Sequence, residues 1–290
     1  MGLRLDTKDI EIHRPVQNYS TTIKRDLSNY IGLSGSMGLK YHWTQNFENH
    51  LILARAFRAP SPNELFSNGV HHGAGAYEIG DPLLKGETAY NISLNSLYRT
   101  EKLELEIGLY TNTIHHFIYL KPLMDKGVPS FITTVRGSFP AFTYEQIDAS
   151  FKGMDGQVSY SISESWSLQQ KTSIVRAYDE LNNTYMVNIP PDRFEYLIRY
   201  QFKKHKQYVS WGITQISMQK RVEVNADFLP PPKGYILGQV HWGISINKFD
   251  LGVSVTNAFN QAYRDYLNRF RYFADDQGQN ISFRATYRFS

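Results

Sequence analysis

Many stretches of this chain alternate apolar and polar side chains at every second residue. In "ISFRATYRF" (281–289), one set of positions holds Ile, Phe, Ala, Tyr and Phe, and the other holds Ser, Arg, Thr and Arg. The same pattern recurs in "LGVSV" (251–255), "YILGQVHWGISI" (235–246), "FEYLIRYQF" (194–202) and "LELEIGL" (103–109). Successive side chains of a strand point to opposite faces, so each stretch predicts a strand with one apolar and one polar face. About 9–11 such residues are enough to cross a bilayer as a tilted strand.

Connections of two contrasting lengths separate the predicted strands. The pattern predicts about eleven strands, near residues 29–43, 49–57, 89–100, 102–118, 142–161, 166–178, 192–203, 207–221, 235–246, 249–258 and 279–289. Tight connections (99–102, 203–207, 247–250) alternate with long ones (58–88, 119–141, 179–191, 222–234, 259–278). Short turns at one end and long loops at the other are typical of outer-membrane barrels, whereas a soluble sandwich has no reason to sort its loops by end. We therefore predict an all-β fold, an antiparallel transmembrane β-barrel.

Composition agrees with this fold and excludes several others. The 290 residues include 20 Tyr and 17 Phe, which suit strands and the aromatic girdles at membrane interfaces. No apolar segment approaches the roughly 20 residues of a transmembrane helix, and residues 1–13 lack the apolar core of a secretory signal. Cysteine is absent, which excludes disulfides and thiolate metal sites. The net charge of +4 comes from dispersed Lys and Arg, so no nucleic-acid partner is expected.

Four motifs give the chain a resemblance to a known family. They are "RAFRAPSPNELF" with "GAYEIGDPLLKGE" (55–66 and 75–87), "NIPPDRF" (188–194), "VTNAFNQAYRDYL" (255–267) and "YRF" (287–289). In order and spacing they resemble the C-terminal half of the barrel of a TonB-dependent outer-membrane receptor. The resemblance implies a place in the outer membrane of a Gram-negative bacterium, a barrel of about 22 strands and an N-terminal plug domain in its lumen. It also implies the import of a scarce nutrient such as a siderophore, haem or a metal ion.

Compared with that family pattern, the sequence predicts only part of a barrel. Residues 29–290 are assigned to the barrel and residues 1–28 to an extracellular loop or irregular segment, with residues 18–26 as a possible twelfth strand. The plug domain and the other barrel half are expected to be missing, so contact with the TonB complex would run through that missing portion. An open arc of strands would leave unpaired backbone groups in lipid, at several kcal/mol each. The chain is therefore expected to pair with a complementary half within the outer-membrane lipid, to close on itself, or to be a truncated remnant.

The stretch from Arg55 to Glu87 contains three prolines and five glycines and is predicted to be an extracellular loop without helix or strand. His71 and His72 lie within it, between "FRAP" (57–60) and "GDPLL" (80–84). In haem-uptake members of the family that the chain resembles, a histidine between an FRAP box and an NPNL-like box is the axial iron ligand. The resemblance thus implies ligand contacts by His71 and His72, with carboxylates from Glu78 and Asp81 nearby.

A second histidine pair extends this hypothesis. His115 and His116 end a predicted strand on the same outer side, so all four histidines are candidate ligands for zinc or haem iron. The transported ligand is then zinc, haem or a ferric siderophore, and no resident cofactor is expected. The alternative is that adjacent histidines are solvated polar residues, because adjacent side chains in extended backbone point in opposite directions.

Four charged residues of the predicted strands are expected to face the lumen. Structural salt bridges facing the lumen, where a whole receptor would contact its plug, are predicted for Glu104, Glu106, Arg284 and Arg288. Besides a receptor or a remnant, a self-closed twelve-strand barrel enzyme is conceivable, but it needs a nucleophile and a base on one strand face. Ser210 and His205 lie too far apart along one strand, so no enzyme is expected.

Overall fold

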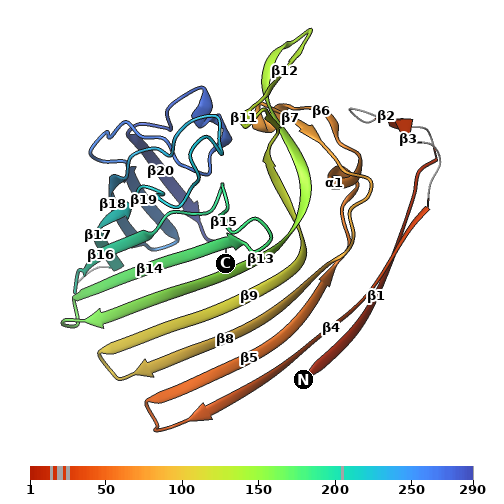
Figure 1. Ribbon diagram of the computed structural model, residues 1–290. Coiled ribbons are helices and arrows are strands. Elements are labelled where there is room, and N and C mark those ends of the chain that lie inside the picture. Colours follow the sequence, from red (N-terminus) through yellow and green to blue (C-terminus); the bar gives the residue numbers. More distant parts are fainter. Residues whose placement is uncertain (14–15, 18–21, 24–26, 204–205, 290) are drawn as a thin grey trace.

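The computed structural model is one curved antiparallel sheet that is open at both edges (Figure 1). It describes residues 1–13, 16–17, 22–23, 27–203 and 206–289. Strands neighbour one another across the sheet in chain order: β1 (Gly2–Glu11), β4 (Leu27–His42), β5 (Phe47–Arg58), β8 (Glu87–Arg99), β9 (Leu103–Pro122), β13 (Gly137–Ser161), β14 (Trp166–Asp179), β16 (Arg193–Gln201), β17 (Lys206–Ile216), β18 (Tyr235–Ile246), β19 (Phe249–Thr256) and β20 (Asn280–Tyr287). Between described residues, β1 and β20 do not pair. The predicted all-β antiparallel fold is confirmed.

The eleven predicted strands are all present, and β1 is a further one. It pairs with β4 along its whole length, so the structure differs here from the irregular segment expected over residues 1–28. The sequence pattern is weak because only Leu3 and Leu5 are apolar on one face, while Thr7 and Asp9 follow them on that face. Most of the suggested strand over residues 18–26 lies outside the described residues. The described part of that range, Thr22–Ile23, forms β3, which pairs with β2 (Val16–Gln17).

The connections sort by length at the two ends of the sheet, as predicted (Figure 1). Residues 43–46, 100–102, 162–165, 202–205 and 247–248 make short connections at one end, and residues 59–86, 123–136, 180–192, 217–234 and 257–279 make long ones at the other. In the tightest turn, Asn247 takes a left-handed conformation (φ 52°), which Asn tolerates better than most residues. β20 ends at the short-connection end, where Tyr287 pairs with Phe249, whereas Gly2 at the start of β1 pairs with Ser36, about midway along β4.

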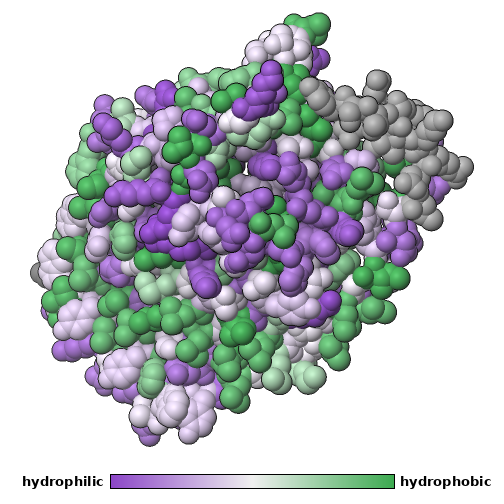
Figure 2. Space-filling view, in the orientation of Figure 1, coloured by the Kyte–Doolittle hydropathy of each residue, from purple (hydrophilic) through white to green (hydrophobic). Residues whose placement is uncertain are grey.

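The two faces of the sheet differ in polarity. Cross-strand pairing aligns one apolar side chain from each of five neighbouring strands in a single row: Leu51, Leu94, Leu109, Met154 and Ile174. On the same outward face Phe283 of β20 is 80% exposed. Figure 2 shows hydrophobic residues concentrated over the lower part of one side of the molecule, below a more hydrophilic region. An apolar face of this extent is unusual in water and is typical of strands that contact hydrocarbon.

Aromatic rings border the outward face at the short-connection end. Ring centroids lie 4.7 Å apart in the pair Tyr41–Trp43, 4.7 Å apart in Trp166–Tyr200 and 5.0 Å apart in Phe249–Tyr287. Such rings have an apolar body and a polar edge, so they favour the boundary between hydrocarbon and water. The predicted aromatic girdle is present at this end.

The loop between β5 and β8 contains regular structure, contrary to the prediction. It holds α1 (Pro62–Phe66), β6 (Asn68–His71), the short 3₁₀ helix η1 (His72–Ala74) and β7 (Ala76–Ile79). The hydroxyl of Ser61 accepts from the N–H of Glu64, whose carboxylate accepts from the N–H of Ser61, and Pro62 begins the helix. Burial opposes ionisation of Glu64, but hydrogen bonds from Arg58 and the Ser61 N–H outweigh it and lower its pKa. Local capping therefore starts a helix in a segment rich in proline and glycine.

The most deeply buried side chains gather at the long-loop end, where the other short elements lie: β10 (Met124–Asp125), β11 (Val128–Pro129), β12 (Phe131–Thr134), β15 (Thr184–Tyr185) and the 3₁₀ helix η2 (Arg269–Tyr272). Leu65 and Phe142 are 0% exposed and Arg271 is 1% exposed. Across the described part of the chain, no helix is both long and apolar enough to cross a membrane. Packing therefore orders the loops, whereas backbone pairing orders the sheet.

The assignment of faces predicts opposite lipid contacts for neighbouring residues of β8. The chain has no cysteine, so Leu94→Cys (outward) and Asn95→Cys (inward) each provide a single labelling site. In protein reconstituted with brominated lipid, we expect strong quenching of a bimane attached at position 94 and little at position 95, because only the outward residue touches acyl chains. The two positions should behave alike once the protein is unfolded in urea. Equal quenching in the folded protein would contradict the assignment.

Candidate functional site

His71 and His72 lie at the long-loop end, at the junction of β6 and η1. Both side chains are exposed. The Nε2 atom of His72 lies 3.0 Å from the Nη1 atom of Arg136, on the tip of the hairpin formed by β12 and β13. A guanidinium always donates, so this ring nitrogen is an acceptor already in use beside a positive charge. A divalent cation at His72 would have to displace that charge, whereas His71 has no such neighbour among the described contacts.

The two predicted carboxylates already have structural partners. Glu78 on β7 is 7% exposed, and its side chain accepts from Arg269 at 2.6 Å and from the Tyr144 hydroxyl at 3.3 Å. The Oδ1 atom of Asp81 accepts from the N–H of Leu83 at 2.9 Å, which closes a local turn. Both carboxylates therefore shape the loop in this structure.

His115 and His116 do not face the lumen together. The pairing of β8 with β9 is unbroken from Arg99 to Thr88, so His115 shares the outward face of Leu109. Its ring lies 6.1 Å from that of Tyr90 and its Nδ1 atom 3.2 Å from Oδ2 of Asp148. His116 has a φ of 57° and sits in a β-bulge, where its N–H donates to Oδ1 of the same aspartate at 3.0 Å.

The structure thus does not bring the four histidines together. Within the described residues, no three His, Asp or Glu side chains form a group that could hold a metal ion. The pleat places His115 on the outward face of β9, whereas His71 ends β6 in the loop between β5 and β8. Sequence spacing alone placed these residues at one end of the barrel without fixing their faces.

A network that the sequence did not predict joins the long loops. Arg271 of η2 forms an ion pair with Asp227, and both side chains are 2% exposed. The hydroxyl of Tyr272 donates to Oδ1 of Asp227 at 2.6 Å, and the guanidinium of Arg271 lies 4.8 Å from the ring of Tyr266. Burial, reinforced by the Asp227 carboxylate, raises the pKa of Tyr272 far above its ordinary value, so the phenol stays a donor. The buried positive charge is balanced and hydrogen-bonded, as stability requires.

Aromatic rings and a second ion pair extend this network to four loops. Phe228 lies 5.0 Å from Phe131, 5.3 Å from Phe142 and 5.5 Å from Tyr272, between ring centroids. Arg269 binds Glu78 and also lies 5.1 Å from the Phe142 ring. We call this assembly the loop cap: Glu78, Phe131, Phe142, Asp227, Phe228, Arg269, Arg271 and Tyr272. It ties the β5–β8 loop to the β9–β13, β17–β18 and β19–β20 loops.

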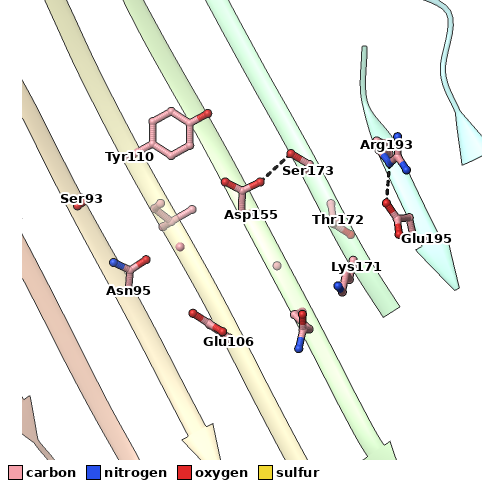
Figure 3. Close-up of a pocket in the computed structure, with 14 residues that line it drawn as sticks. Ser93, Asn95, Glu106, Tyr110, Asp155, Lys171, Thr172, Ser173, Arg193 and Glu195 are labelled. Carbon is pink, nitrogen blue, oxygen red and sulfur yellow. Dashed lines mark hydrogen bonds and ion pairs between the residues drawn. The ribbon is translucent and has the colours of Figure 1, made fainter. Parts of the chain in front are cut away.

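Below the loop cap the inward face of the sheet is polar. Figure 3 shows Ser93, Asn95, Glu106, Tyr110, Asp155, Lys171, Ser173, Arg193 and Glu195 along one hollow on that face. The Ser173 hydroxyl donates to Asp155 at 2.7 Å, and Arg193 donates to Glu195 at 2.6 Å. Such a surface can bind polar solutes or a polar protein surface through hydrogen bonds.

The predicted inward salt bridges are confirmed at two of the four positions. Glu104 pairs with Arg99 at 2.8 Å, and Arg288 pairs with Asp250 at 2.5 Å. Glu106 and Arg284 instead line separate hollows of the inward face.

The sequence did not predict one contact between a serine and a histidine. His241 on β18 lies 2.9 Å from the hydroxyl of Ser254 on β19, through Nδ1. A hydrolase needs a third group that orients the imidazole. Among the described contacts no carboxylate meets either ring nitrogen, so this pair lacks that part of a catalytic site. His205, paired with Ser210 in the sequence-based test, lies outside the described residues.

Comparison with known proteins gives the same architecture. The family described as "TonB dependent receptor-like, beta-barrel" matches residues 1–290. The "TonB-dependent heme receptor A" of Haemophilus influenzae (strain 86-028NP) is 23% identical over 309 residues, covering 94% of this chain and 39% of that protein. The "Heme/hemopexin utilization protein C" of Haemophilus influenzae (strain ATCC 51907 / DSM 11121 / KW20 / Rd) is 24% identical over 259 residues, 81% of this chain and 35% of that protein.

A solved structure titled "Copper transporter OprC" superposes with a TM-score of 0.79 at 17% identity, over 97% of this chain and 44% of that chain. At this identity the likeness concerns the fold alone. The chain spans less than half the length of these relatives.

The buried ion pair of the loop cap makes a testable prediction. Replacing one partner, as in Asp227→Asn, leaves the Arg271 charge buried and should cost about 3–5 kcal/mol locally. We expect faster hydrogen exchange and proteolysis in residues 217–234 and 257–279, measured by mass spectrometry. The double variant Asp227→Leu with Arg271→Met should recover much of the protection, because no charge is then buried alone.

The exposed ion pair between Arg264 and Asp275 provides a matched control. Asp275→Asn should change little, since exposed pairs contribute about 0–1 kcal/mol. Unchanged exchange in Asp227→Asn would show that the pair does not hold the loops.

Proposed function

Because this chain belongs to the family of TonB-dependent receptor-like β-barrels, we propose that it forms part of the wall and outer entrance of an outer-membrane receptor that imports a metal-bearing ligand. Members of the family are outer-membrane proteins of Gram-negative bacteria. The relatives reported above are named for haem and copper, which supports a ligand that carries a metal. In this proposal the energy from TonB reaches the receptor through a plug domain that other residues of the receptor supply.

The opposite polarity of the two faces supports the assignment as a barrel wall. The outward apolar rows suit lipid, and the inward polar hollows suit a hydrated lumen or a plug surface. The unpaired edges of β1 and β20 cannot lie in hydrocarbon, because each free N–H or C=O there costs several kcal/mol. We infer that in the membrane both edges pair with further strands.

The single observation that carries the proposal is the loop cap. Four loops meet above a polar inward face and are fixed to one another by buried contacts. A barrel that served only as a membrane-spanning wall would not need loops that are fixed to one another at one end. An ordered set of loops over a lumen is what a selective entrance requires.

For contact with the ligand, we propose His71 first and His72 second. His71 is an exposed imidazole at the mouth, and neutral imidazole suits iron, zinc and copper. His72 shares its ring nitrogen with Arg136, so it favours a ligand with an anionic group beside the metal. Glu78 and Asp81 are assigned to shaping the loop, and His115 is not assigned to the ligand because of its outward face.

The test is uptake by cells that produce the receptor containing this chain and lack their own receptors for the same nutrients. Haem, a ferric siderophore, zinc and copper would be supplied separately, each with a radioactive or isotopically enriched metal. We expect accumulation of one of them, abolished when the proton-motive force is collapsed. Failure with every ligand, from a receptor present in the outer membrane, would favour a truncated remnant.

The ligand role of the first histidine pair gives a sharper prediction. For a receptor in which His71 ligates the metal, His71→Ala should weaken binding of the transported ligand by roughly tenfold or more, since a lost ligand bond exceeds 1.4 kcal/mol. Titration calorimetry on detergent-solubilised receptor would measure this. His42→Ala, at the short-connection end beside Glu48, is the control and should leave binding unchanged. Equal binding by all three proteins would remove His71 from the site.

A further inference from the structure

An apolar groove crosses the outward face near the long-loop end. It has a volume of about 450 Å³, and aliphatic side chains of four neighbouring strands line it, among them Leu3, Leu33, Met37, Leu53 and Ile92. The direct partner of Arg55 on β4 is Gly35, and the side chain of Leu3 on β1 lies over this glycine. The groove is shallow and open to the outside of the sheet.

The guanidinium of Arg55, three residues before the end of β5, borders this groove. The Nη1 atom of Arg55 donates to the Leu33 carbonyl, and Nε donates to the Tyr90 hydroxyl at 3.4 Å. The carbon of the guanidinium lies 5.7 Å from the centre of the Tyr90 ring. These contacts hold one edge of the guanidinium, and its Nη2 atom has no partner among the described contacts.

Among the outward-facing arginines of the described strands, Arg55 has no ion pair with a described carboxylate, whereas Arg176 has one. Arg176 on β14 also faces outward, but it holds Asp192 through two contacts of 2.5 and 2.8 Å. Arg58, three residues after Arg55, holds both Glu64 and Glu87. An unbalanced guanidinium beside hydrocarbon is costly unless the surroundings supply an anion.

From this juxtaposition we propose that the groove binds one phosphate-bearing lipid of the leaflet on the long-loop side, with its acyl chain along Leu33, Met37, Leu53 and Ile92 and its phosphate on Arg55. The groove accepts the chain because its surface is almost entirely apolar. The free edge of the guanidinium accepts the phosphate because Arg recognises phosphate oxygens through parallel N–H donors. The Tyr90 hydroxyl, next to Arg55, can also donate to the headgroup. This inference rests on the proposed membrane location.

Another outward cation lies away from the groove and serves as a comparison. Lys152 on β13 is exposed and has no ion-pair partner among the described contacts. It is not among the residues that line the groove. Replacing Lys152 therefore removes an outward positive charge without altering the groove, which makes it a matched control.

The test is native mass spectrometry of the receptor containing this chain, extracted from outer membranes and exchanged into mixed micelles with one added lipid. The probes are dioleoyl phosphatidic acid, dioleoyl phosphatidylcholine and oleate, each at the same mole fraction. We expect one retained molecule of phosphatidic acid and about tenfold weaker retention in Arg55→Gln, the factor that 1.4 kcal/mol produces. Lys152→Gln should retain the lipid as the natural protein does.

A second variant tests the tail rather than the charge. Ile92→Trp should fill the groove and release phosphatidic acid while leaving Arg55 intact. Equal retention by Arg55→Gln and the natural protein, or equal loss in Lys152→Gln, would overturn the inference. Retention of oleate as strong as that of phosphatidic acid would overturn the phosphate assignment.

The outcome separates this inference from the proposed function. A polypeptide absent from the outer-membrane fraction would refute the proposed function. A receptor that resides there and imports its ligand, but holds no lipid through Arg55, would refute only the lipid site.

Discussion

In hydrocarbon every backbone N–H and C=O needs a partner, and this requirement decides most of the structure of this chain. It favours long strands joined in one antiparallel sheet, because only neighbouring strands can satisfy those groups. With pairing fixed, the pleat leaves each residue just two directions. Apolar residues then share the outward face and polar residues share the inward face, as the row from Leu51 to Ile174 and the hollow around Asp155 illustrate.

The same constraint moves the packed core out of the sheet and into the loops. A curved sheet of one layer has no second layer against which to bury side chains, so its apolar residues stay exposed on the outward face. At the long-loop end the backbone leaves the sheet and must find partners again, and there Leu65, Asp227 and Arg271 become buried. The entrance is therefore ordered by the interactions that stabilise a small soluble domain.

Sequence reasoning predicted the strands well because their signal is local and periodic. It missed β1, where Thr7 and Asp9 interrupt the apolar face, and α1, where one capping box outweighs the effect of nearby prolines and glycines. The site was harder to predict because its contacts are not local. Arg269 binds Glu78 across 191 residues of sequence, and the local sequence around either residue does not predict this contact. The bulge at His116 likewise depends on the partner strand.

Charge balance connects the entrance with the lipid-facing wall. Asp227 supplies the counter-ion for Arg271, and Asp192 supplies it for Arg176. Each of these ion pairs is complete within the chain and stabilises the fold. Arg55 follows the same physics without a carboxylate of its own, and two neutral oxygens hold only one edge of it. A cation needs its counter-charge from somewhere when water is scarce. For this half-covered guanidinium on the outward face, the source that we propose is the membrane, whose lipid phosphates can reach the edge of Arg55 that no described contact holds.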